Sequence, residues 1–455
     1  MPTFLQSSLA LADIPVPRDL PLPLPISESL LRVGIVLLFL LHIFFVNLMV
    51  GGSLLTTILE IVGLRIPRFD TLARAIADTV TVNKSLAVVL GIGPLLMINL
   101  LYTSQFYAAN ALTGHAWALL IPLITAAFLL TYLHKYTWER WAGPKKLRHV
   151  LTGAAGALLF LGIPLIFLTN INLMLFPSKW SEVTGFFSSL RIGNVFPRYF
   201  HFLSASLALT GLFLAQWFGR SGFPVATTLP DFNHAQLRRF FYRWTFFVSL
   251  AQFAFGPLLL LTLPTEGLTN GVLALVLGGA AFAGLTLYVI WTEIKAPDAI
   301  IGRRFWLAAS MFAVVVLAMG QGRHLYRESS LAPQRRLIAE RTTKFLAIEA
   351  ETQARLQAGL DAGSSLTAPP SGKKIFSQIC SACHAVSKPI AAPALVEIYQ
   401  LYKGNPAGIV AWAKAPGKKR PQYGQMPSMA ALGDEQLALV AAYMLEQGGK
   451  AAGNP

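Results

Sequence analysis

Long apolar runs separated by short polar segments dominate the first 326 residues of the chain. Helices built from these runs would be long enough to cross the hydrocarbon core of a bilayer, which is roughly 30 Å thick. The pattern therefore predicts an all-α, polytopic membrane helix bundle over residues 30–326. We expect about eight spanning helices, at residues 30–61, 85–107, 115–136, 150–176, 197–218, 241–263, 271–292 and 304–324.

The segments on either side of this bundle have different patterns. Residues 1–29 contain only a short apolar run, without a basic segment before it, and their second half is rich in proline, so they predict an extramembrane arm and not a signal peptide. Residues 327–371 predict an amphipathic helix over 331–360, followed by a flexible linker of glycine, serine and proline. Residues 372–455 predict a small soluble domain.

The composition agrees with a membrane protein, since 54% of the 455 residues are hydrophobic, 13% are charged and the mean hydropathy is +0.56. The net charge of +16 would by itself suggest nucleic acid as a partner. However, the basic residues gather in the loops after the first, third, fifth and seventh predicted helices, and the alternate loops hold few. The positive-inside rule explains this distribution, excludes nucleic acid as the reason for the charge, and places both termini on the outer side.

The soluble tail carries a Cys-x-x-Cys-His motif formed by Cys380, Cys383 and His384. Two thiols at this spacing can bond to the vinyl groups of one haem, and the adjacent histidine can then ligate the iron. A redox dithiol or half of a zinc site is the alternative, but neither a βαβ pattern nor further zinc ligands accompany the motif. We predict one covalent haem c. In bacteria this attachment takes place outside the inner (cytoplasmic) membrane, so both termini are expected in the periplasm.

Four further histidines lie on the predicted outer side, and these are His42, His115, His201 and His324. An imidazole within a bilayer is costly and predicts a functional partner, for which haem iron is the main candidate. We predict one or two non-covalent haems b, with His42 and His201 as the leading ligands. A histidine hydrogen-bonded to a neighbouring helix is the alternative, and it has more weight for His115 and His324. The histidines at the inner edge are expected among solvated or headgroup-facing charges: His134, His149 and His234.

Residues 30–326 contain four segments that are shared with one family of membrane proteins: Leu41–Val46 with Gly51, Gly52 and Glu60; Asn170–Pro177; Phe200–Phe202; and Gly322–His324. On these segments the region resembles subunit I of cytochrome bd-type quinol oxidases. The resemblance implies that His42 ligates a high-spin haem at an oxygen site and that His201 ligates a low-spin haem b.

The chain departs from the bd-type pattern at several points. Residues 79–138 contain no aspartate or glutamate, and only residues 264–270 stand where the family has a long quinol-binding loop. The methionine ligand that the family implies in the seventh helix is also absent, with Leu275 and Leu277 nearby. His324 is a candidate replacement for that ligand.

From Gly372 to about Gly448 the chain resembles a class I cytochrome c. Its N-terminal helix would end at the haem motif, and its C-terminal helix would begin at Asp434. The segment Gly424–Pro427 matches the distal-methionine loop of the family, which implies Met426 as the sixth iron ligand and Met429 as the alternative. A basic cluster beside this loop could attract an acidic redox partner: Lys414, Lys418, Lys419 and Arg420.

The sequence indicates a membrane-bound respiratory protein that passes electrons between haem c and haem b. Its expected partners are membrane lipid and either a periplasmic redox protein or other respiratory subunits, with quinone as a further candidate. A bd-like terminal oxidase fed by cytochrome c and a membrane anchor that carries only haem c are the alternatives. The missing acids argue against the oxidase, because oxygen reduction consumes protons that intramembrane acids normally supply.

Overall fold

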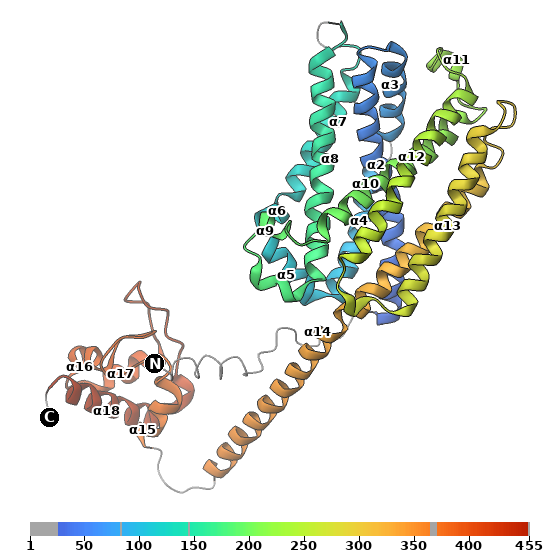
Figure 1. Cartoon of the computed structure of the whole chain (residues 1–455). Helices are drawn as coiled ribbons and strands as arrows, with labels where there is room; N and C mark the ends of the chain where they lie inside the picture. Colours follow the sequence, from blue (N-terminus) through green and yellow to red (C-terminus); the bar gives the residue numbers. More distant parts are fainter. Residues whose placement is uncertain (1–25, 82–83, 144–145, 365–370, 454–455) are drawn as a thin grey trace. The chain divides into compact units, whose positions relative to one another are not determined.

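The computed structural model describes residues 26–81, 84–143, 146–364 and 371–453, and over these ranges the chain is helical and contains no strand (Figure 1). It forms two compact units, Met1–Ala347 and Ile348–Pro455, and the boundary between them lies inside one long helix. The N-terminal arm expected at residues 1–29 lies almost entirely outside the described residues, which begin at residue 26. The first described helix begins at Glu28.

Within the described ranges, six helices are long and apolar enough to cross a membrane. They are α2 (Glu28–Gly63), α8 (Lys146–Met174), α10 (Val195–Gly219), α12 (His234–Leu261), α13 (Asn270–Lys295) and α14 (Phe305–Ser364). A seventh span is formed if α4 (Lys84–Leu101) and α5 (Thr103–Thr113) are taken together, and α7 (Leu120–Tyr136) is a shorter apolar helix. The chain is therefore a polytopic membrane protein, and the all-α prediction is confirmed.

Two expected helices have different bounds in the structure. The helix expected at 85–107 is broken at Tyr102, where the axes of α4 and α5 differ by 112°. The Tyr102 ring is buried and its hydroxyl donates a hydrogen bond to Glu328, so a tertiary contact holds the break in place. The helix expected at 115–136 is divided into α6 (His115–Ala118) and α7.

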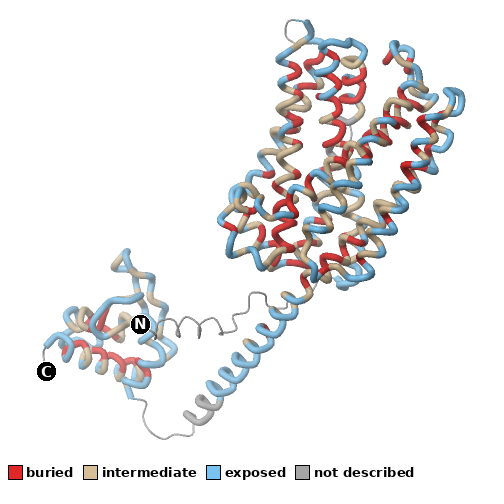
Figure 2. The backbone as a smooth tube through the Cα atoms, in the orientation of Figure 1, coloured by how far each residue is buried: buried red, intermediate tan, exposed pale blue. Residues whose placement is uncertain are grey.

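The last expected membrane helix and the expected amphipathic helix are one continuous element. α14 contains 60 residues, and its internal proline, Pro333, does not end it. A helix of this length is about 90 Å long, which is far more than the bilayer requires. Residues 346–357 are exposed along all sides of the helix (Figure 2).

A polar seam joins α2 to α10 in the middle of the membrane unit. Ser206 donates a hydrogen bond to the Asn47 side chain at 2.8 Å, and Thr210 donates to the Asn47 carbonyl at 3.2 Å. A Cβ at Gly51 would collide with the Ser206 carbonyl, so only glycine permits this approach. Such contacts between small and hydroxyl side chains are typical of packed membrane helices.

On the side of the basic loops, α3 (Pro67–Thr81) packs along α2 and buries Leu72, Ala73 and Ile76. The short elements of this unit lie in the connections between the long helices. They are η2 (Pro177–Glu182), α9 (Phe186–Ser189), α11 (Val225–Thr228) and η3 (Thr265–Gly267).

The second unit ends in a small helical domain with its own core. Its elements are α15 (Gly372–Ile375), η4 (Phe376–Cys380), α16 (Leu395–Tyr402), α17 (Pro406–Lys414), η5 (Ala430–Leu432) and α18 (Gly433–Ala451). Phe376 packs with Leu395 and with Val440 and Ala441 of α18. α18 begins one residue before the expected Asp434, whose carboxylate pairs with Lys414 and does not cap the helix.

Candidate haem centres

The Cys-x-x-Cys-His motif lies at the end of a π-helical turn. In η4 the helix widens by one residue, and Ser381 N–H donates to the Phe376 carbonyl at 2.9 Å. Cys380 is half-buried against the core of the domain, and Cys383 is exposed. His384 Nδ1 donates to the Pro393 carbonyl at 2.8 Å, because a carbonyl can only accept. This bond leaves Nε2 free and fixes the ring orientation, as an iron ligand requires.

The predicted sixth ligand, Met426, lies half-buried in the loop between α17 and η5. The end of this loop is tied to α17, since the Ser428 hydroxyl donates to the Lys414 carbonyl and Met429 N–H donates to the Ala413 carbonyl at 2.8 Å. Met429 is also half-buried. The geometry leaves both methionines as candidates, and Met426 stays the predicted ligand.

His42 has the same hydrogen-bond pattern as His384. It lies half-buried in α2, and its Nδ1 donates to the Ala87 carbonyl of α4 at 2.8 Å, which leaves Nε2 as the free acceptor. Gly91 of α4 allows this approach, because a Cβ there would lie 2.9 Å from the His42 ring. The tautomer and the ring orientation both suit a metal ligand.

His201 and His324 each have a buried Nδ1 with no hydrogen-bond partner in the described structure. A buried polar atom without a partner is costly, so each ring fits a ligand that the chain itself does not supply. Gly256 of α12 faces the His201 ring. His324 was expected at a helix end but lies within the continuous α14, with 7% of its surface exposed.

Three arginines lie near these histidines. Arg198 and Arg327 are each 8% exposed, and Arg323 stacks on the ring of Phe39 at 4.4 Å. Arg323 is close enough to Arg198 and Arg327 for their like charges to interact. In the described residues none of the three forms an ion pair, and buried cations are normally paired. The cluster therefore suits a ligand with carboxylates, such as the two propionates of haem b.

The structure supports the remaining predicted site residues to different degrees. His115 is exposed at the first position of α6, and its side chain makes no hydrogen bond in the described structure. Leu275 lies against Gly322, two residues before His324, which agrees with His324 as a replacement ligand near that position. The basic cluster of the tail is partly neutralised, because Lys414 pairs with Asp434 and Arg420 pairs with Glu397.

Two inner histidines are not in the environment that the sequence predicts. His134 is 3% exposed and His149 is 0% exposed, and both contact the buried carboxylate of Glu60. The expectation of solvated or headgroup-facing charges is wrong for these two residues. The third, His234, donates from Nδ1 to the Phe218 carbonyl at 3.0 Å and stays half-buried.

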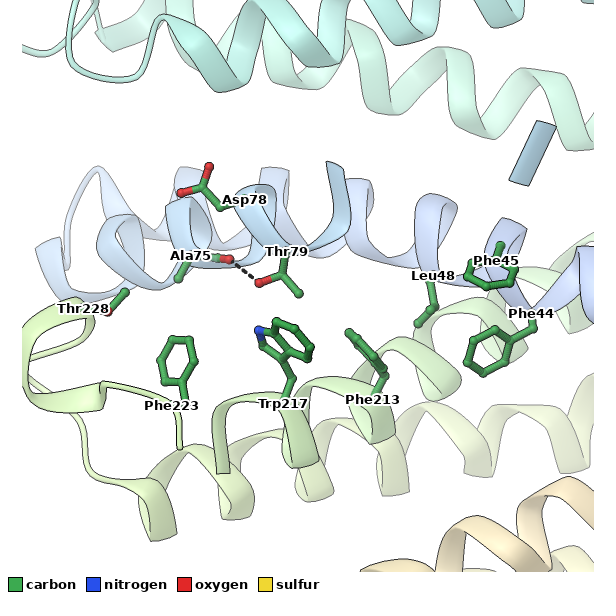
Figure 3. A pocket seen from close by; sticks show the side chains of 10 residues that line it. All are labelled: Phe44, Phe45, Leu48, Ala75, Asp78, Thr79, Phe213, Trp217, Phe223 and Thr228. Atoms are coloured by element: carbon green, nitrogen blue, oxygen red, sulfur yellow. Dashed lines mark hydrogen bonds between the residues drawn. The ribbon is translucent and has the colours of Figure 1, made fainter. Parts of the chain in front are cut away.

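A separate cavity of about 460 Å³ opens between α2, α3 and α10. Figure 3 shows the rings of Phe213, Trp217 and Phe223 pointing toward α3, with Thr79 opposite them. None of the predicted haem ligands lines this cavity. Its lining is mostly aromatic and apolar.

Comparisons with known proteins identify the tail domain and the fold of the membrane unit. Residues 370–448 match the family model Cytochrome c. The structure of bd oxidase from Geobacillus thermodenitrificans is similar to this chain with a TM-score of 0.54 and 13% identity, over 73% of this chain and 98% of that one. No curated protein matches the sequence. The chain thus combines a membrane bundle with a bd-oxidase-like fold and a cytochrome c domain, which implies covalent haem c.

Proposed function

We propose that this protein passes electrons between the haem c of its tail and one or two haems b in its membrane unit. His42 and His201 are the proposed haem b ligands, with His324 as a third. The observation that carries the proposal is the set of buried imidazole nitrogens without partners at His201 and His324, beside three unpaired arginines. The cofactors supply the redox chemistry, and the chain supplies ligation, orientation and charge.

We propose the bacterial inner membrane as its location, with both termini in the periplasm. Haem c attachment outside the membrane and the basic alternate loops support this placement. A periplasmic redox protein or another respiratory subunit would then exchange electrons with the tail. Lys418 and Lys419 support such a contact, since neither has an acidic partner in the described structure and exposed cations attract acidic surfaces.

Rapid mixing of the purified protein with a reduced soluble cytochrome tests this proposal. The c-type absorption band should appear first, and the b-type band should follow at a rate independent of donor concentration. The His201→Ala variant should reduce its haem c normally and show a diminished b-type signal. Reduction of a b-type centre in a variant without haem c, at the normal rate, would contradict the route.

A second candidate function is a bd-like terminal oxidase fed by cytochrome c, which the fold of the membrane unit favours. Carbon monoxide and oxygen distinguish it from pure electron transfer. A high-spin centre that binds carbon monoxide, together with oxygen uptake from a reduced cytochrome donor, would establish the oxidase. A spectrum that carbon monoxide does not change would leave electron transfer as the function.

A further inference from the structure

Five ionisable side chains meet at the ends of α2, α3, α7 and α8 on the side of the basic loops: Glu60, Asp70, His134, Lys146 and His149. The Glu60 carboxylate is completely buried and accepts from His134 Nε2 at 2.6 Å, from Lys146 Nζ at 2.8 Å and from His149 Nδ1. Lys146 also pairs with Asp70 at 2.6 Å. The proposed electron transfer does not use this cluster.

Both ring nitrogens of His149 face acceptors. Nδ1 lies against the Glu60 carboxylate, and Nε2 lies 2.7 Å from the backbone carbonyl of His134. A neutral imidazole has one N–H and would leave one nitrogen lone pair facing an acceptor, whereas an imidazolium donates to both. The cluster then contains two carboxylates, one ammonium and one imidazolium, so its charges balance.

We infer that this cluster is a buried proton-binding site, in which one proton on His149 is held between Glu60 and the His134 carbonyl. His134 is neutral and donates from Nε2 to Glu60. Without the bound proton, the completely buried Glu60 carboxylate would share its one cation, Lys146, with the partly exposed Asp70, which is unfavourable for a buried charge.

The same three residues, Glu60, His134 and His149, have donor atoms close enough to suggest a metal ion. The distances favour a proton instead. Zinc bonds of about 2.0–2.2 Å in tetrahedral geometry hold neighbouring donor atoms more than about 3 Å apart, whereas His134 Nε2 and Glu60 lie 2.6 Å apart. Lys146 already contacts the same carboxylate. The Trp138 ring packs against both imidazoles, and its centroid lies 5.0 Å from that of His134 and 4.6 Å from that of His149.

The site is far from His42, one of the proposed haem b ligands. Glu60 follows His42 by 18 residues on α2, which is five turns and about 27 Å along the axis. At that distance and an effective dielectric constant of about 20, one electron at His42 changes the proton affinity by about threefold. The proton should therefore stay bound when the haems change oxidation state.

Nuclear magnetic resonance of the full-length protein, labelled with ring-¹⁵N histidine, tests this assignment. One histidine should show two protonated ring nitrogens in both redox states, because His149 faces an acceptor at each nitrogen. His149→Asn should remove that signal, Glu60→Gln should convert it to a neutral ring, and the matched control His234→Asn should leave it unchanged. A neutral His149 in the wild-type spectrum would overturn the proposal.

A zinc titration gives an independent outcome that does not require a folded Glu60 variant. The wild-type protein should bind no zinc at this cluster, so the His134 and His149 resonances should not shift when zinc is added. Stoichiometric zinc binding that shifts both resonances would show that the cluster is a metal centre and would overturn the proton-binding site. The haem content need not be known for either experiment, so failure here is distinct from failure of the proposed function.

Discussion

The hydrogen bonds of the imidazole rings distinguish His149 from the candidate ligands. His42 and His384 use Nδ1 to donate to a carbonyl and keep Nε2 free, and His201 and His324 bury a ring nitrogen that has no partner in the described residues. His149 uses both nitrogens and has none left for iron. Residue type alone does not reveal this difference, because it depends on which carbonyl or carboxylate the fold brings to each ring.

The distal ligand of haem c can be assigned by a pair of matched substitutions. Met426→Leu should lower the midpoint potential of haem c by on the order of 0.1 V, since a thioether raises this potential and axial ligands set it over about 0.8 V. Met429→Leu should leave it near the wild-type value. Redox titration of the c-type band provides the measurement, and the reverse pattern would assign Met429 as the ligand.

The buried arginines should set the potential of haem b. Arg198→Gln removes a cation that favours the reduced centre, so the b-type midpoint potential should fall by tens of millivolts. Glutamine still offers a polar side chain toward Asn194, to which Arg198 now donates at 3.0 Å. The exposed Arg191→Gln serves as the control. Equal midpoint potentials in the wild type and both variants would show that Arg198 does not face a haem.

The proximity of Glu60, His134 and His149 in the proton-binding cluster cannot be predicted from the sequence. Glu60 lies 74 residues from His134 and 89 residues from His149, and no local pattern connects them. The haem c motif could be recognised because its three residues lie within five positions of the chain. Local motifs are therefore predictable from the sequence, whereas sites assembled from distant helices require the fold.

At the scale of elements, the length of each apolar run predicts where helices form, but it does not predict where a helix is broken. The polar residues Thr103, Ser104 and Gln105 follow Tyr102, but they do not by themselves predict a bend of 112°. The hydrogen bond that stabilises it comes from Glu328, 226 residues later. The polar segment after His324 was expected to separate two helices, but it contains good helix formers and continues α14 to Ser364.

The contact between α2 and α10 depends on a single glycine. Gly51→Ala places a methyl group against the Ser206 carbonyl and should destabilise the membrane unit by about 1–3 kcal/mol through overpacking. Thermal unfolding in detergent gives the measurement. Gly162→Ala in α8 is the control, because its Cβ would meet no atom within 4 Å, and it should be neutral or slightly stabilising. Equal stability of both variants would contradict close packing at Gly51.

At the scale of the whole molecule, the chain joins two units that each have a separate core. The tail buries Ile375, Leu395 and Val440 among its own helices. The membrane unit places its candidate ligands on α2, α10 and α14, without any residue of the cytochrome c domain. Each unit should therefore bind its own haem independently.

A truncated chain that ends at Ser364 tests this independence. It should keep the b-type spectrum of the full-length protein, lack covalent haem c, and no longer be reduced by a soluble cytochrome donor. The full-length Cys380→Ser, Cys383→Ser double variant is the control for effects of truncation and should behave in the same way. Loss of the b-type spectrum in both proteins would show that the membrane unit depends on the tail.

The pyridine haemochrome assay of the purified wild-type protein tests the central claim most directly, because it counts c-type and b-type haems separately. We predict one haem c and at least one haem b per chain, with the b-type haem reduced in amount by His42→Ala or His201→Ala and unchanged by His115→Ala. A protein that contains haem c alone, with the same spectrum in all three variants, would contradict the account.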